Sequence, residues 1–344
     1  MNFFHIFVRQ RSLLALPAFV AVSLFLFSVS GAVSAQELKL DPKKVTGPDA
    51  CGECHKNTIT AWKSSKHSTT FKKLPRSKDA KKIAKAMGLR RIKAASDCLS
   101  CHFTSGVPKK KVKPIAGITC ESCHGAGADY IKTHSDYGGK GVTKENETPE
   151  HKKERYAKSM AAGLIRPSKL YEVANNCYGC HTVPNEKLVN VGGHAAGSAF
   201  ELVSWSQGEV RHNVWYSKSN DEASAARKRM MYIVGKSLDL EHALRGVGKA
   251  TAKAAYADSM EKRANGARSA LEKVAESVKA PELAAIIAAA KGAKLKLNNA
   301  AELNAAAGKV GEAARKFADN YDGGDFGSID SLIPGSDKFK GKVK

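Results

Sequence analysis

Four Cys-x-x-Cys-His pentads constrain this chain more than any other feature, because together they use all eight of its cysteines. In a helical turn, positions i, i+3 and i+4 share one face, so the two thiols and the imidazole point the same way. That arrangement suits two thioether bonds to a haem and one bond to its iron, and the pentad is the signal for covalent haem attachment. We therefore predict four c-type haems, bound covalently by Cys51, Cys54, Cys98, Cys101, Cys120, Cys123, Cys177 and Cys180, with proximal iron ligands His55, His102, His124 and His181.

Zinc sites and disulfides are the two plainer explanations of these cysteines. Zinc fingers place each histidine far from its cysteine pair, unlike the pentads. An even number of cysteines permits disulfides in an oxidising compartment, but disulfides give no reason for a histidine after every second cysteine. The pattern therefore favours haem attachment.

The N-terminus has the layout of a secretory signal. Arg9 and Arg11 precede an apolar run over 13–27, and small residues follow up to Ala35. This predicts a signal peptide over 1–35, cleaved after Ala35, and a periplasmic or otherwise exported protein. An uncleaved membrane anchor is the alternative, but the run is short of the roughly 20 residues that a span needs. No stable membrane insertion is expected after cleavage.

The chain is strongly basic, with 56 Lys and Arg against 33 Asp and Glu and a net charge of +23. Loss of the signal segment removes two arginines and no acid, which leaves +21. Short basic runs such as 109–111 are typical of a solvated face. So large a surplus also favours encounters with an acidic redox partner and makes them sensitive to salt. Nucleic-acid binding is not expected, because export removes that partner and no recognition motif is present.

Length predicts two domains after the signal segment, a tetrahaem cytochrome c domain over 36–219 and a C-terminal helical domain over 220–344. Aromatic residues are only 7% of the chain, so buried porphyrins are expected to supply much of the first core. Gly-, Pro- and Lys-rich segments at 108–114 and 138–149 predict loops. The expected fold class is mainly α, with little sheet. Short helices are predicted over 57–73, 78–95 and 150–163.

The C-terminal domain is predicted to be an Ala- and Lys-rich helical bundle. Apolar residues recur at i, i+3, i+4 and i+7 in two stripes, over 267–278 and 303–317. A structural cap is the plain interpretation of these stripes, and a partner-docking module is the alternative. Four or five antiparallel helices are expected, with breaks at Gly246, Gly266, Pro281, Gly292, Asn298, Asn299, Gly323 and Gly324.

Histidines outside the pentads are candidates for the second axial position of each iron, since low-potential haems usually take two histidines. His67 follows the first pentad by 12 residues, and His134 follows the third by 10. Such short tethers do not pass easily round a haem, so each is expected to reach a neighbouring haem and join the haems in one array. His194 and His212 follow the last pentad, and at least one of them is expected to be distal.

The other histidines and the methionines are weaker candidates. His151 lies in a charged stretch and is expected to be a solvated helix residue. His242 lies in the helical extension and is expected to be structural. Four methionines fall in helical patterns, where core packing is the default role. These are Met87, Met160, Met230 and Met231.

Several motifs around the pentads are typical of one known family. They are Ala61-Trp62-Lys63 and Lys66-His67, Asp97 before the second pentad, Gly117-Ile-Thr before the third and Gly125 after it, then Tyr130, His134 and an isolated fourth pentad. Over roughly residues 45–185 the chain thereby resembles the cytochrome c-554 family, the tetrahaem electron carriers of ammonia-oxidising bacteria. The helical extension is longer than the tail associated with that family.

The resemblance implies a mostly helical haem domain with closely stacked haem pairs, parallel within a pair and steeply inclined between pairs. It also implies three bis-histidine haems and a five-coordinate haem at the second pentad. His67 and His134 match distal ligands of the family in position. The third distal ligand falls where this chain departs from the family. There His194 and His212 stand in place of one candidate, so six-coordination of all four haems is the alternative.

Electron transfer between periplasmic redox proteins is the function that these features favour, with an electron carrier preferred over an enzyme. By family analogy a hydroxylamine-oxidising multihaem enzyme is a candidate donor. The first alternative is a reductase of nitric oxide, nitrite or hydroxylamine at a five-coordinate haem, although no catalytic residues are marked beside it. A membrane-anchored quinol dehydrogenase is the second alternative.

Overall fold

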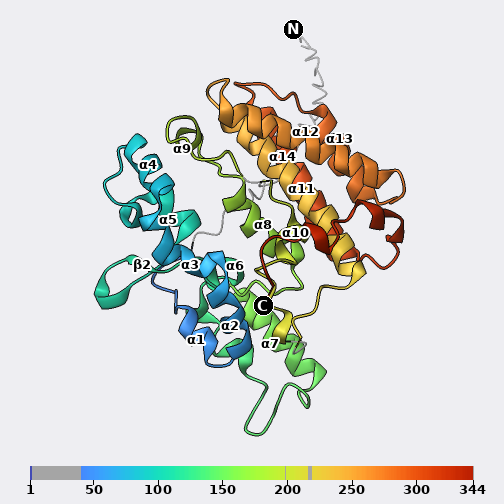
Figure 1. Ribbon diagram of the computed structural model, residues 1–344. Coiled ribbons are helices and arrows are strands. Elements are labelled where there is room, and N and C mark those ends of the chain that lie inside the picture. Colours follow the sequence, from blue (N-terminus) through green and yellow to red (C-terminus); the bar gives the residue numbers. More distant parts are fainter. Residues whose placement is uncertain (2–39, 198, 216–218, 344) are drawn as a thin grey trace. The chain divides into compact units, whose positions relative to one another are not determined.

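The computed structural model describes Met1 and residues 40–197, 199–215 and 219–343 (Figure 1). Apart from Met1, the predicted signal peptide over 1–35 lies outside the described residues. Residue contacts separate Met1–Ala32 from a second unit, Val33–Lys344, to which all the elements below belong.

The described fold is mainly α, as predicted, with 61% of residues in helices. Among the described residues, sheet is limited to one antiparallel pair, β1 (Thr104–Gly106) and β2 (Lys113–Ala116), with an irregular register beside Thr104. This hairpin overlaps the segment 108–114, which the Pro and Lys content predicts as a loop. The connection between the strands contains the 3-10 turn Pro108–Lys110.

Serine and threonine side chains cap three helices of the N-terminal half, those that begin at Lys66, Lys78 and Pro149. Ser65 is extended and its side chain accepts from the amide of Ser68, so the helix expected over 57–73 divides into two. Gly88 has a φ of +71°, which ends the helix expected over 78–95 near its middle. The helices are α1 (Pro48–Gly52), α2 (Lys56–Ser64), α3 (Lys66–Lys73), α4 (Lys78–Ala86), α5 (Ser96–His102), α6 (Glu121–His124), α7 (Pro149–Ala161), α8 (Leu170–His181), α9 (Glu186–Asn190) and α10 (Leu202–Ser206).

Short 3-10 helices connect these elements and close the chain. They are η1 (Leu74–Arg76), η2 (Ile92–Ala94), η3 (Pro108–Lys110), η4 (Gly127–Asp129), η5 (Thr133–Ser135), η6 (Asn213–Trp215), η7 (Gly327–Leu332) and η8 (Ser336–Lys338).

The C-terminal part of the described chain forms a bundle of four α-helices that lie side by side in Figure 1. Gly246 and Gly266, predicted as breaks, instead lie inside two of these helices, and that prediction is wrong. Close helix packing requires glycine at position 246, because a Cβ there would come within 2.6 Å of the Met260 side chain. The helices are α11 (Ala225–Lys249), α12 (Ala255–Ala275), α13 (Pro281–Gly292) and α14 (Ala300–Asn320).

The main apolar core crosses residue 220. It joins Tyr178 of α8 and Val203 of α10 to Leu238 of α11 and Phe317 of α14. Helix α8 packs directly against α11, so the bundle supports the element that carries the fourth pentad. The boundary between the two predicted domains stays a prediction.

Candidate haem-binding sites

Helical turns place the cysteines and histidine of each pentad on one side. In the first pentad the His55 amide donates to the Cys51 carbonyl at 2.9 Å, and in the third the His124 amide donates to Cys120 at 2.8 Å. The second pentad lies within α5 and the fourth ends α8. Each pentad can therefore present two thiols and an imidazole together, as covalent haem attachment requires.

Each pentad histidine faces one histidine from elsewhere in the chain, and all four distal candidates are used. A ring nitrogen binds a metal at about 2.0 Å and lies about 1.1 Å from its ring centroid, so two imidazoles on one metal have centroids roughly 6.2 Å apart. All four pairs fit this spacing, which makes each pair suitable for the two axial positions of a haem iron. The centroids are 6.3 Å apart for His55 and His134, for His67 and His181 and for His102 and His194, and 6.4 Å apart for His124 and His212.

Backbone carbonyls orient four of these rings. The Nδ1 atom lies 2.8 Å from the Ile165 oxygen in His124 and 3.2 Å from the Tyr130 oxygen in His134. Because a carbonyl only accepts, Nδ1 carries the proton and Nε2 keeps the lone pair that binds a metal. The same contact is made by His194 with Ala195 at 2.8 Å and by His212 with Val210 at 2.7 Å.

Burial keeps five of the paired imidazoles neutral. It lowers the pKa of His102 to about 4 and that of His181 to about 4, because the charged form is poorly solvated there. Burial also lowers the pKa values of His55, His67 and His124. Neutral imidazole is the form that ligates a metal, so these rings are ready to bind at neutral pH.

The four pairs fall into two neighbouring groups. Burial is the largest cause that lowers the pKa of His55, and His134 and then His212 lower it further. Because His212 pairs with His124, the first pentad lies near the third. Likewise the pKa of His102 is lowered by burial, then by His194 and by His67, which relates the second pentad to the fourth. The groups are joined where the Asn176 side chain of α8 donates to the Cys123 carbonyl at 3.0 Å.

Glu121, inside the third pentad, ties that pentad to the chain just before the first one. Its fully buried carboxylate accepts from the amides of Thr46 and Gly47 at 2.9 Å each and from Gly127 at 2.7 Å. The Cys51 and Cys120 thiols also lie close enough to shift each other's pKa, which is raised for Cys51 and lowered for Cys120. Sequence reasoning missed this role, since nothing in Cys-Glu-Ser-Cys-His marks the glutamate as a long-range acceptor.

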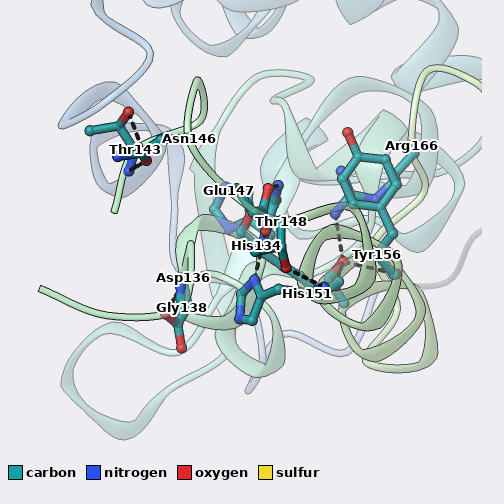
Figure 2. A network of polar contacts seen from close by, with 12 residues as sticks. His134, Asp136, Gly138, Thr143, Asn146, Glu147, Thr148, His151, Tyr156 and Arg166 are labelled. Atoms are coloured by element: carbon teal, nitrogen blue, oxygen red, sulfur yellow. Dashed lines mark hydrogen bonds and ion pairs between the residues drawn. The ribbon is translucent and has the colours of Figure 1, made fainter. Parts of the chain in front are cut away.

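A buried ion pair supports the turn that carries His134 (Figure 2). Arg155 donates from Nε to Glu147 at 2.7 Å and from Nη2 at 2.5 Å, while its Nη1 donates to the His134 carbonyl at 2.6 Å. The Nδ1 atom of His151 lies 2.7 Å from the same carboxylate, whose side chain is 1% exposed. His151 is therefore half-buried and paired, and its prediction as a solvated residue is wrong.

Aromatic residues and the bundle surround the fourth pentad. The His181 ring stacks on Phe200 at 4.4 Å and contacts Trp205 at 5.0 Å. Nearby, Nε2 of His242 lies 2.7 Å from the Asn175 side-chain oxygen, and burial lowers the pKa of His242 to about 3. His242 thus joins α11 to α8 and faces no pentad histidine.

The geometry at the second pentad bears on the choice between five- and six-coordination, which stays a prediction. A five-coordinate haem there needs an open side opposite His102, but the His194 ring occupies that side with its centroid 6.3 Å away. His194 follows the short helix α9. The Asn185 side chain caps the first turn of this helix by accepting from the Leu188 amide, and it also donates to the Asp97 carboxylate at 2.9 Å. The described geometry thus corresponds to the six-coordinate alternative.

Comparisons with known proteins agree with the motif pattern. Residues 50–125, which hold the first three pentads, match the family model "Cytochrome c554 and c-prime". A curated relative, cytochrome c-554 of Nitrosomonas europaea, is 27% identical over 170 residues, which is 47% of this chain and 65% of the relative. The match thus spans less than two thirds of the relative's length. No solved structure matches this chain.

Among the described residues, no helix has both the length and the apolar character needed to cross a bilayer. A match to a cytochrome c family implies covalently bound c-type haem. The two comparisons confirm the resemblance to the cytochrome c-554 family that the motifs predict.

Proposed function

We propose that this chain is an exported c-type cytochrome with four covalently attached haems, which carries electrons between redox proteins. The observation that carries the proposal is the set of four histidine pairs with centroids 6.3–6.4 Å apart. Each pair combines one pentad histidine with one partner, as four bis-histidine sites require. The family match over residues 50–125 supports a c-type cytochrome electron carrier.

The protein's own residues would bind and orient the cofactors. The eight pentad cysteines supply thioether bonds, and the paired imidazoles supply the axial nitrogens. The carbonyls of Ile165, Tyr130, Ala195 and Val210 hold the rings in the Nδ1-protonated form. When bound, each haem supplies an iron that takes up or releases one electron. Two strong-field axial ligands leave no iron position for a substrate, which suits transfer without chemistry.

The two neighbouring groups support an order of sites for electron flow. The first and third sites share one group, the second and fourth share the other, and the Asn176–Cys123 contact joins the third to the fourth. We propose a path through the first, third, fourth and second sites, in either direction. The second site would then be one end of the path.

A reductase needs an open iron, and the His102–His194 pair does not favour one. The geometry therefore favours the carrier over the reductase. The predicted signal peptide supports a periplasmic location, and the high positive charge supports acidic redox partners. A hydroxylamine-oxidising multihaem enzyme is a candidate donor by the family resemblance.

The test is haem stoichiometry and spin state in the mature holoprotein, produced with a c-type haem maturation system. Intact mass under denaturing conditions should show four covalent haems, and EPR of the oxidised protein should show only low-spin ferric iron. Fewer than four haems would refute the tetrahaem proposal. A high-spin signal that yields a nitrosyl complex after reduction would restore the reductase.

A further inference from the structure

The positive charge of this chain is concentrated around the second pentad. Residues 66–113 contain fifteen Lys and Arg but only two acids, Asp79 and Asp97, a net of +13 within a chain total of +23. Fourteen of the fifteen side chains are exposed, and Lys93 is half-buried. Among the described residues, no ion pair joins any of them to a carboxylate. The surplus is therefore available to a partner.

Helix α4 turns its cations away from the pentad because its apolar side is already used. Ala80 and Ala84 pack in a small core with Ile92 and Phe103, against which Cys98 and Leu99 of the second pentad also pack. Four of the remaining positions carry exposed lysines, which form a cationic outer face. These are Lys78, Lys81, Lys82 and Lys85.

The β1–β2 hairpin adds a second cationic element beside the pentad. Lys109 and Lys110 both have a positive φ, 53° and 61°, which is unusual for residues with a side chain. Val112 follows them with a side chain that is 63% exposed, one of few large apolar residues on the described surface. An exposed apolar residue within a ring of cations is common in protein interfaces, where charge steers and apolar contact binds.

A hollow lies between η2, the second pentad and the β1–β2 hairpin. It has a volume of about 390 Å³, and Leu99, from between the two cysteines of the pentad, lines it. Its rim includes Arg91, Lys93, Val112 and Lys113, and the Lys93 ammonium lies 3.3 Å from the Phe71 ring centroid. Ser100 of the same pentad is exposed. The second attachment motif thus reaches the surface in the middle of the cations.

We infer that this cationic face, formed by α4, η2 and the β1–β2 hairpin around the second pentad, docks an acidic redox protein. The inference rests on the proposed function, because it places the docked partner at the second site, one end of the proposed path. The carboxylates of such a partner would pair with the free cations, and Val112 would contact its surface. One electron would pass between the partner's reduced cofactor and one ferric haem.

An anionic membrane surface is the competing occupant of so basic a face. Membrane-surface helices keep a free apolar side that enters the lipid. Helix α4 has no such side, because Ala80 and Ala84 are packed in the small core, Ile83 is half-buried and Ala86 is the one fully exposed apolar residue of the helix. An attachment motif in the middle of the face also has no use on a lipid surface. The observations therefore favour a protein.

The test uses holoprotein and an acidic flavodoxin, reduced to its hydroquinone, as the probe. The hydroquinone gives up one electron to become the semiquinone while one ferric haem becomes ferrous, and stopped-flow absorbance gives the second-order rate constant. The variant K109E/K110E/K111E reverses the hairpin tip. The control K253E/K262E/K309E makes the same charge change at three exposed bundle lysines without an ion-pair partner among the described residues.

At low ionic strength the hairpin variant should react about tenfold more slowly than the parent, and the control should lose roughly twofold or less, because steering acts through the local field. High salt should remove most of the difference. Zero-length carbodiimide cross-linking should join flavodoxin carboxylates to lysines within 66–113.

Equal slowing of both variants, or cross-links spread over the bundle, would overturn the docking inference. Unchanged flavodoxin rates, together with loss of the hairpin variant's binding to phosphatidylglycerol vesicles, would assign the face to membranes instead. Haem stoichiometry and EPR of the same samples separate these outcomes from failure of the proposed function. A protein with four low-spin haems that docks elsewhere refutes only the docking face.

Discussion

The imidazoles of His102 and His194 face each other with ring centroids 6.3 Å apart and planes inclined by 46°. The Nδ1 of His194 lies 2.8 Å from the Ala195 carbonyl, so its Nε2 is the free nitrogen. The second pentad thus has a partner ring with the same spacing as the other three. Under the proposed function, this relationship favours an electron carrier over a reductase.

Replacement of His194 by alanine should open the second site. The oxidised His194→Ala holoprotein should gain one high-spin ferric EPR signal, because one iron loses a strong-field ligand. His151→Gln is the matched control, since His151 pairs with Glu147 and no pentad histidine. If the two variants have the same low-spin spectrum, His194 is not an iron ligand.

Ring orientation predicts two kinds of low-spin signal. The planes of His55 and His134 are inclined by 18°, whereas those of His124 and His212 are inclined by 84°. Near-perpendicular imidazoles leave the two iron dπ orbitals close in energy, which gives a strongly anisotropic signal with a large maximum g value. His212→Met should abolish that signal and keep the rhombic one. Loss of the rhombic signal instead would contradict the pairing.

The Glu147–Arg155 pair should make the free energy of unfolding depend on pH in the acid range. The Arg155 hydrogen bonds hold the pKa of Glu147 at about 2, against about 4.3 in an unfolded chain. The native state therefore binds fewer protons, and the contribution is present above pH 4.3 and is lost as pH falls toward 2. Glu147→Gln should be less stable than the parent at pH 7, with a gap that narrows below pH 4 in urea unfolding. A constant gap would show that the charge is not responsible.

His242 should destabilise the protein in mild acid. Burial lowers its pKa to about 3, against about 6.5 when unfolded, so between these values only the unfolded chain takes up the proton. Stability should then fall as pH drops below 6.5, by at most about 1.4 kcal/mol per pH unit. His242→Gln can still donate to Asn175 and should lose this part of the slope. If the free energies of unfolding of the two proteins change in parallel between pH 7, 5.5 and 4.5, His242 is not the cause.

Gly311 should be intolerant of a methyl group. A Cβ there would come within 2.5 Å of the Glu241 carboxylate, which accepts from the Tyr171 hydroxyl at 2.6 Å. Gly311→Ala should cost about 1–3 kcal/mol in the free energy of unfolding. Gly308→Ala on the same helix meets nothing within 4 Å and should be neutral or stabilise by about 0.5–1 kcal/mol. Denaturant titration of both variants checks the difference, and equal effects would rule out the steric cause.

The chemistry of attachment could be read from the residues alone, because it depends on spacing within one helical turn. Two thiols and an imidazole at positions i, i+3 and i+4 lie on one face in any helix. The mainly α fold followed in the same way from local periodicity. The breaks expected at Gly246 and Gly266 failed, since a glycine within a helix can serve close packing, as Gly246 does against Met260.

Ring pairing, by contrast, required the folded chain. His102 meets His194 and His124 meets His212 across long stretches of sequence. Local patterns carry no information on which distant segments meet, because those contacts depend on the packing of α5, α8 and α9 and on acceptors such as Glu121. The residues therefore predict how many haems are attached and by which cysteines. The fold specifies which histidine completes each pair and which basic residues surround the second pentad.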